Sequence, residues 1–193
     1  MGNNLTMISL ISVSRKLTGK PRFSSEMKKL QNKALFLDRD GTINAEKHYV
    51  YKVEDFEFRE GIFELVQDYF HRGYLVFVIT NQAGIARGYY SERDLHLLNG
   101  WMVEQFRQKG IQITKVYYCP HHPDITGYCN CRKPHPGMIL DAESEYDLDL
   151  AASVLIGDKE SDIEAGLNAH VGTNYLIKET GKVNLEDVIV YKG

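Results

Sequence analysis

The feature that most constrains the fold is a series of five short apolar runs, separated from one another by longer stretches of helical character. In chain order the runs are ALFLD (34–38), LVFVIT (75–80), KVYYC (115–119), SVLIGD (153–158) and GTNYLI (172–177). Their apolar residues are continuous rather than alternating, which is typical of strands that are covered on both faces of a parallel sheet. The pattern therefore predicts an α/β fold built on a doubly wound, Rossmann-like parallel sheet.

Helices are expected between these strands. They cover residues 61–72, residues 91–108, a segment that opens at Pro136, and residues 158–169. The second helix carries a start signal, because the Ser91 hydroxyl and the Asp94 carboxylate stand at the spacing of a capping box. The order of strands and helices places ligands beyond the carboxyl ends of the strands.

The domain organisation is simple. Residues 1–33 are polar, rich in serine and without a sustained period, so we expect an N-terminal tail there and a single domain over 34–193.

The net charge of −3 argues against a nucleic-acid partner. No apolar run approaches the ~20 residues of a membrane helix, so no membrane association is expected. We expect a cytoplasmic protein, because the three cysteines are clustered and do not form a disulfide framework, and we expect a monomer.

Polar residues collect at the carboxyl ends of the predicted strands. Asp38 ends the first strand and Asp40 follows it, Thr80 ends the second, and Asp158 ends the fourth. One aspartate at a strand end is usually a turn former or a helix cap. Three strands that bring carboxylates or hydroxyls to one edge, with Lys133 shortly after the third strand, instead indicate a catalytic site.

This set of residues suits phosphoryl transfer. Asp38 and Asp158 can bind Mg²⁺, which prefers oxygen ligands and offsets the repulsion between a carboxylate and a phosphate. Asp38 can then attack phosphorus, and Asp40 can act as general acid and base. Lys133 and Thr80 can bind the phosphoryl oxygens during the transfer.

The motifs DRDGT, VITNQ, RKP and GDKESD together resemble the haloacid dehalogenase superfamily of phosphotransferases, over about residues 34–180. The resemblance implies that Asp38 is nucleophile and metal ligand, that Asp40 is the acid/base and lends its main-chain carbonyl to the metal, and that Asp158 binds Mg²⁺. No inserted cap is visible in the sequence. Residues 43–59 and the loop after the third strand leave the only room for a lid, so the fold should be nearly capless.

A second cluster lies in CPHHPDITGYCNC, where Cys119, Cys129 and Cys131 accompany two histidines. Thiolates and imidazole suit tetrahedral Zn²⁺, and four protein ligands indicate a structural rather than a catalytic site. His121 and His122 compete for the fourth position. The C-x-H spacing of the resembling family selects His121, so the zinc would stabilise a loop that leads directly into Arg132 and Lys133.

The zinc loop, with FLDRDGTIN, NQAGIARG and CRKPHPGM, narrows the resemblance to the heptose bisphosphate phosphatases. It implies a small phosphorylated sugar as substrate, in the synthesis of nucleotide-activated heptose for surface glycans. It also implies that residues 46–49 and 80–83 line the substrate-binding site and that Arg132 recognises the substrate. Lys159 is also a candidate for substrate binding, because it stands next to Asp158. These substrate-binding candidates are Glu46, Lys47, His48, Tyr49, Asn81, Gln82, Ala83, Arg132 and Lys159.

Other functions remain open from the sequence, among them a phosphatase that acts on DNA or RNA ends. The histidinol-phosphate phosphatases share the zinc loop, and Glu46 could bind the ammonium group of such a substrate. A non-enzymatic phospho-acceptor domain also has aspartates at strand ends, although it does not need an acid/base at Asp40. A zinc-containing nucleic-acid binder is disfavoured by the acidic net charge.

Overall fold

The computed structural model describes residues 31–178, 181–186 and 188–193. These residues belong to one compact unit that spans 31–193. The expected tail over 1–33 lies outside the described residues except for its last three positions, of which Lys33 already opens the first strand, so the tail stays a prediction. Among the described residues, no helix has the length and apolarity that crossing a membrane requires.

A six-stranded sheet forms the centre of the fold. Its strands are β1 Lys33–Leu37, β2 Tyr74–Asn81, β3 Ile113–Cys119, β4 Val154–Gly157, β5 Thr173–Leu176 and β6 Ile189–Lys192. They lie in the order β3-β2-β1-β4-β5-β6, and the first five are parallel, as the apolar runs predicted. The antiparallel edge strand β6 was not predicted; it is short and mostly exposed, and its apolar residues are only Ile189, Val190 and Tyr191.

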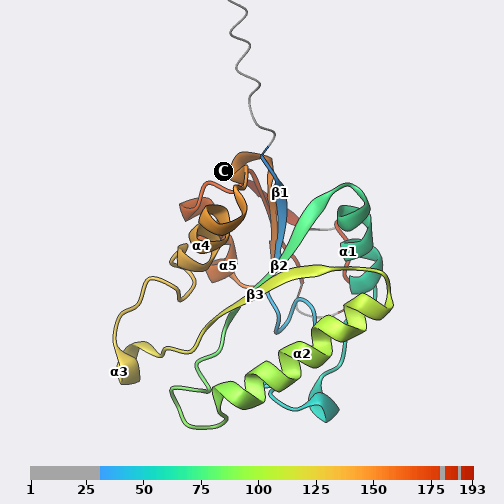
Figure 1. Cartoon of the computed structure of the whole chain (residues 1–193). Helices are drawn as coiled ribbons and strands as arrows, with labels where there is room; N and C mark the ends of the chain where they lie inside the picture. The colour runs from blue at the N-terminus through green and yellow to red at the C-terminus, as the bar shows by residue number, and fades with distance from the viewer. Residues whose placement is uncertain (1–30, 179–180, 187) are drawn as a thin grey trace, which may run out of the picture. The chain divides into compact units, whose positions relative to one another are not determined.

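Helices cover both faces of the sheet, with α1 and α2 on one side and α4 and α5 on the other (Figure 1). The helices are α1 Ile62–His71, α2 Glu92–Gln108, α3 Pro123–Thr126, α4 Gly137–Tyr146 and α5 Glu160–Asn168, with short 3-10 helices at Val53–Asp55 and Leu150–Ala152. The predicted capping box is confirmed, since the Ser91 side chain accepts from the Asp94 amide while the Asp94 carboxylate accepts from the Ser91 amide. Helix α3 and the 3-10 helices are too short to have been predicted from periodicity.

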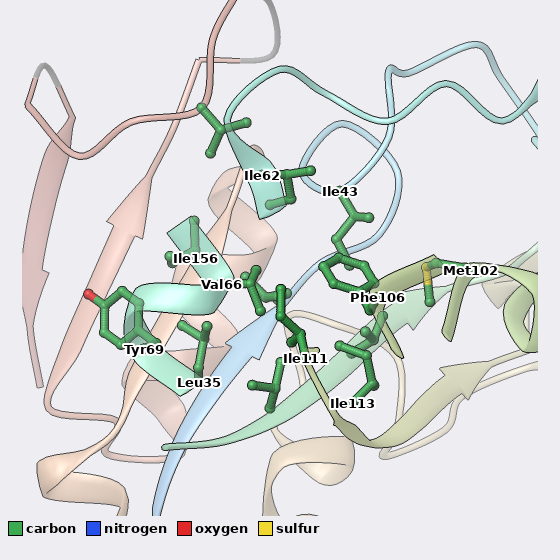
Figure 2. Packing of buried hydrophobic residues seen from close by; sticks show 14 of the residues in the cluster. Leu35, Ile43, Ile62, Val66, Tyr69, Met102, Phe106, Ile111, Ile113 and Ile156 are labelled. Carbon is green, nitrogen blue, oxygen red and sulfur yellow. The ribbon is translucent and has the colours of Figure 1, made fainter. Parts of the chain in front are cut away.

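Successive side chains of β1 enter different cores. Leu35 packs with Val66 of α1 and Phe106 of α2 in the core that Figure 2 shows. Phe36 lies on the opposite face, in the cluster that contains Ile139 of α4. Because successive side chains of a strand point to opposite faces, a strand between two helical layers must be apolar at every position. This explains the unbroken apolar run at 34–37.

The order of the strands creates a crevice beside β1. The chain runs outward from β1 through β2 to β3 and then returns to β4 on the other side of β1. Ligands bind at such a switch point, beyond the carboxyl ends of the strands. Asp38 follows β1 and Asp158 follows β4 at this point. Gly41, with φ of +90°, permits the close approach, because a Cβ there would lie 2.2 Å from Asp158 Oδ2.

Candidate active site

A cavity of about 500 Å³ opens at this crevice. Most of the residues that the sequence predicted for the site line it, and they come from the end of β2 and from the loops that follow β1, β2, β3 and β4. Those residues are Asp38, Asp40, Glu46, His48, Tyr49, Thr80, Asn81, Gln82, Ala83, Arg132, Lys133 and Lys159. The same cavity is also lined by Tyr90 and Asp162, which had not been predicted as site residues.

Lys133 carries the buried positive charge at the floor of the cavity. Its Nζ lies 2.8 Å from Asp38 Oδ1 and 2.7 Å from Asp162 Oδ1, and it donates to the Ile79 carbonyl at 2.8 Å. The side chains of Lys133 and Asp162 are each 2% exposed. Three contacts therefore fix the ammonium beside Asp38.

Three carboxylates share this region. Oxygen atoms of Asp38, Asp158 and Asp162 all lie within 4.8 Å of one another. Asp158 also accepts a hydrogen bond of 3.1 Å from the Thr42 hydroxyl. Three carboxylates against the one buried ammonium of Lys133 leave an excess of two negative charges, and oxygen donors with that charge suit a hard divalent cation.

The environment disfavours negative charge on these carboxyl groups. Burial raises the pKa of Asp38 to about 8, the ammonium of Lys133 opposes the rise, and the carboxylates of Asp162 and Asp158 add to it. Burial also raises the pKa of Asp158. Burial works against the charge of Lys133 as well, but the carboxylates of Asp162 and Asp38 keep its pKa above the usual value. A cation bound between the carboxylates would relieve this strain.

The surroundings of Asp40 differ from those of Asp38. Both carboxylate oxygens of Asp40 accept hydrogen bonds from neighbouring side chains. The Arg39 guanidinium makes a forked contact, with NH2 2.9 Å from Oδ2 and Nε 3.2 Å from Oδ1. Asn44 donates to Oδ1 at 3.1 Å and Gln82 donates to Oδ2 at 2.8 Å. Arg39 is itself fully buried and is held by the Val50 carbonyl and by Asn99 of α2. The carboxylate of Asp40 is thus held in one orientation.

Asn81, at the end of β2, and Gln82, which follows it, line the cavity. Their contact with substrate stays a prediction, and both amides also make hydrogen bonds within the protein. Gln82 is 2% exposed and donates to Thr80 Oγ1 as well as to Asp40. Asn81 exchanges two hydrogen bonds of 3.1 Å with the main chain of Lys133. Both amides therefore hold neighbouring site residues in place.

The mouth of the cavity contains an ion pair between Glu46 and Lys159. Lys159 Nζ lies 2.8 Å from Glu46 Oε2, and the two side chains are 50% and 16% exposed, respectively. Arg132 is held on the other side by a 3.2 Å hydrogen bond to the His121 carbonyl. Lys47 does not belong to the cavity lining, since its ammonium pairs with Glu57 at 2.9 Å on the surface. The resemblance implied the whole range 46–49, and the direction of the Lys47 side chain is not visible in the sequence.

The predicted metal-binding loop brings its four donors together. Cys119, His121, Cys129 and Cys131 each offer one donor atom within 4.8 Å of the others, and measured pairs lie 3.1 to 3.6 Å apart. Three thiols and one imidazole gathered this closely are the donors, in type and number, that a tetrahedral Zn²⁺ takes, so the donor set fits that ion. His122 faces elsewhere, since its ring accepts from the Asp124 amide and contacts Arg87.

Sequence reasoning missed three residues of the site. Asp162 could have been found, because it stands in the first turn of α5, one helical turn after Asp158. Arg39 lies between the two aspartates and looks like a surface residue in the sequence, although it is fully buried. Tyr90 stands next to Tyr89 in the sequence, and nothing there distinguishes the buried ring from the exposed one.

Comparison with known proteins agrees with this geometry. The family model described as HAD-hydrolase-like matches residues 130–189. A D-glycero-alpha-D-manno-heptose-1,7-bisphosphate 7-phosphatase of Campylobacter jejuni is 54% identical over 153 residues, which cover 79% of this chain and 87% of that protein. A D-glycero-beta-D-manno-heptose-1,7-bisphosphate 7-phosphatase of Escherichia coli K12 is 42% identical over 154 residues, covering 77% and 80%.

A solved structure has the same architecture. The D,D-heptose 1,7-bisphosphate phosphatase of B. bronchiseptica, complexed with magnesium and phosphate, superposes with a TM-score of 0.69 at 32% identity. The match covers 75% of this chain and 79% of that one.

Proposed function

Since the chain belongs to the heptose bisphosphate phosphatase family of haloacid dehalogenase-like (HAD) hydrolases, we propose that it is a phosphatase that removes the 7-phosphate of D-glycero-D-manno-heptose 1,7-bisphosphate. The observation that carries the proposal is the position of Lys133, 2.8 Å from Asp38 and inside a cavity of about 500 Å³. Such a cavity accommodates a phosphorylated sugar. The product would supply the synthesis of nucleotide-activated heptose.

Magnesium would be held by Asp38, Asp158 and the main-chain carbonyl of Asp40. When bound, it offsets the charge repulsion between the nucleophilic carboxylate and the phosphate. The excess of two negative charges among the buried carboxylates supports a divalent ion here. We further propose that Zn²⁺ occupies the cluster of Cys119, His121, Cys129 and Cys131 and has a structural role.

The residues divide the reaction between them. In the first step Asp38 forms a bond to phosphorus while the bond to the sugar oxygen breaks, and Asp40 gives a proton to that oxygen. In the second step water attacks the aspartyl-phosphate and gives a proton to Asp40, so that phosphate leaves and Asp38 is restored. Lys133 and Thr80 hold the phosphoryl oxygens in both steps. Thr80 Oγ1 already accepts from Gln82, which leaves its own proton for the phosphate.

The part of the substrate that is not hydrolysed would meet the mouth of the cavity. Arg132 provides positive charge there for the second phosphate. Glu46 is already paired with Lys159 at 2.8 Å, which disfavours its use as the partner of a substrate ammonium. This pairing favours a bisphosphate over histidinol phosphate.

A substrate panel in the presence of Mg²⁺ tests the proposal. It compares both anomers of the heptose bisphosphate, histidinol phosphate and a 5′-phosphorylated oligonucleotide, because the relatives act on both anomers according to their names. We expect kcat/KM to be highest for a heptose bisphosphate. Preference for histidinol phosphate would refute the substrate and leave the aspartate chemistry standing. If none of the four releases phosphate, the phosphatase proposal itself is wrong.

A further inference from the structure

Tyr90 is a buried residue of the cavity to which the chemistry above gives no role. It immediately precedes Ser91, the N-cap of α2, and is 7% exposed. Its hydroxyl donates a hydrogen bond of 2.5 Å to Gln82 Oε1. Burial raises the pKa of Tyr90 to about 12, so the hydroxyl keeps its proton at any pH at which the enzyme works.

Both the nitrogen and the oxygen of the Gln82 side-chain amide make hydrogen bonds. Its Nε2 donates to Asp40 Oδ2 and to Thr80 Oγ1, each at 2.8 Å. A carboxylate accepts only, so the nitrogen end must face Asp40, and the oxygen end must then find a donor elsewhere. Tyr90 is that donor among the described residues. Without it, a buried amide oxygen would lack a partner, and the side chain would turn away or admit water.

The ring of Tyr90 is fixed independently of its hydroxyl. It stacks on Tyr51, with centroids 5.1 Å apart and planes inclined by 9°. It also packs over Gly84, where a Cβ would come within 2.2 Å of the ring. Removing only the hydroxyl should therefore leave the ring in place, so that the hydrogen bond can be tested separately from packing.

We infer that Tyr90 is a positioning residue, which acts through Gln82 to hold the Asp40 carboxylate and the Thr80 hydroxyl in their working orientation. The inference rests on the proposed function, in which Asp40 transfers the proton and Thr80 holds the phosphoryl group. Asp40 has to be aligned in both steps, first with the leaving oxygen and then with the attacking water. The loss of Tyr90's hydrogen bond should therefore lower kcat, with little effect on substrate affinity.

The decisive experiment compares Tyr90→Phe with Tyr51→Phe. Each variant removes one hydroxyl from the same stacked pair of rings, but only that of Tyr90 bonds to Gln82. We expect Tyr90→Phe to lower kcat about fivefold to thirtyfold while KM changes by less than about twofold. Tyr51→Phe should keep kcat within about twofold of the wild type. Equal losses in the two variants, or a loss confined to KM, would overturn the inference.

A double-mutant cycle tests whether Tyr90 acts through Gln82. In a Gln82→Leu background, or Gln82→Met if that variant does not fold, Tyr90→Phe should have no further effect on kcat. Losses that simply multiply would show that Tyr90 acts independently of Gln82. The cycle is measured on p-nitrophenyl phosphate as well as on the bisphosphate, because Asp40 activates water for both. A wild type that ignores the bisphosphate would refute the proposed substrate, whereas the cycle on p-nitrophenyl phosphate would still decide the role of Tyr90.

Discussion

Replacing Lys133 with methionine should destabilise the protein far more than replacing any surface lysine. The Lys133 ammonium is the buried cation between Asp38 and Asp162, at 2.8 and 2.7 Å. Methionine has a similar length but no charge. The variant would therefore leave two carboxylates facing each other in a buried site without their common partner.

The size of the effect follows from these distances. Removing one partner of a buried ion pair costs roughly 3–5 kcal/mol of folding free energy. The two carboxylates lie within 4.8 Å of each other, and their repulsion at an effective dielectric constant of ~20 is about 3.5 kcal/mol. The two estimates describe the same uncompensated charge and agree. Turnover should also fall by about a hundredfold or more, because a phosphoryl ligand is lost.

The pH dependence has a definite sign. Lys133 lowers the pKa of Asp38, so in the variant this carboxyl group should have a pKa above even the wild-type value of about 8. A carboxyl group with a raised pKa in the folded state binds its proton more tightly there, so stability falls as pH rises above the unfolded value of ~3.9. The cost of Lys133→Met should accordingly be smaller near pH ~7, where Asp38 is largely protonated in both folded proteins, and larger near pH ~9, where this carboxyl group ionises in the wild type but not in the variant.

Urea unfolding at these two pH values measures the effect, with and without Mg²⁺. Lys159→Met is the matched control, because the Lys159 side chain is half exposed and its pair with Glu46 lies at the mouth of the cavity. That pair should contribute about 1 kcal/mol or less. Mg²⁺ should recover part of the stability of Lys133→Met at the higher pH. A loss below about 1 kcal/mol for Lys133→Met, or a loss that does not depend on pH, would refute the reasoning.

Three further predictions concern the chemistry and the zinc loop. Asp38→Asn should abolish turnover and Asp40→Asn should reduce it strongly, while circular dichroism shows that both variants are folded; more than a few per cent activity in Asp38→Asn would exclude it as the nucleophile. Arg132→Ala should lower kcat/KM for the bisphosphate about tenfold to a hundredfold and for p-nitrophenyl phosphate much less, since Arg132 lies at the mouth; equal losses would place it in the catalytic phosphate site. Purified protein should contain about one zinc per chain by elemental analysis, and Cys129→Ser should lower both zinc content and thermal stability; zinc-free protein with full activity would contradict the assignment of the cluster.

The parts of the fold that follow from backbone pattern could be predicted from the sequence. The run at 34–38 predicted a strand buried on both faces, and β1 is such a strand, one residue earlier at Lys33–Leu37. The carboxyl ends of parallel strands meet at one edge of the sheet, so Asp38, Thr80, Lys133 and Asp158 could be placed together at that edge from the sequence alone. Sequence periodicity carries this information because both the sheet and its helices repeat regularly.

The contacts that hold the site residues in place could not be predicted in the same way. Gln82 lies in a motif that suggested contact with substrate, but its amide is turned inward toward Asp40 and Thr80. Lys47 lies between Glu46 and His48, but its side chain points to Glu57 instead. Whether a loop side chain faces the cavity or the protein depends on local dihedral angles and on partners far away in the sequence. The periodicity of the sequence does not predict these dihedral angles or these distant partners.

Two aspartates that stand two residues apart thus receive contrasting environments from the same loop. Asp38 lies among like charges, with Asp158 and Asp162 near it and Lys133 as the buried cation, so it still requires a metal ion to carry its charge. Asp40 is surrounded by neutral and cationic donors and requires none. A side chain that must attack a phosphate benefits from a cation shared with its target, whereas one that must give and take a proton benefits from a fixed orientation. The donors around Asp40 and the carboxylates around Asp38 therefore support the two proposed roles, independently of the order in which the two residues occur in the motif.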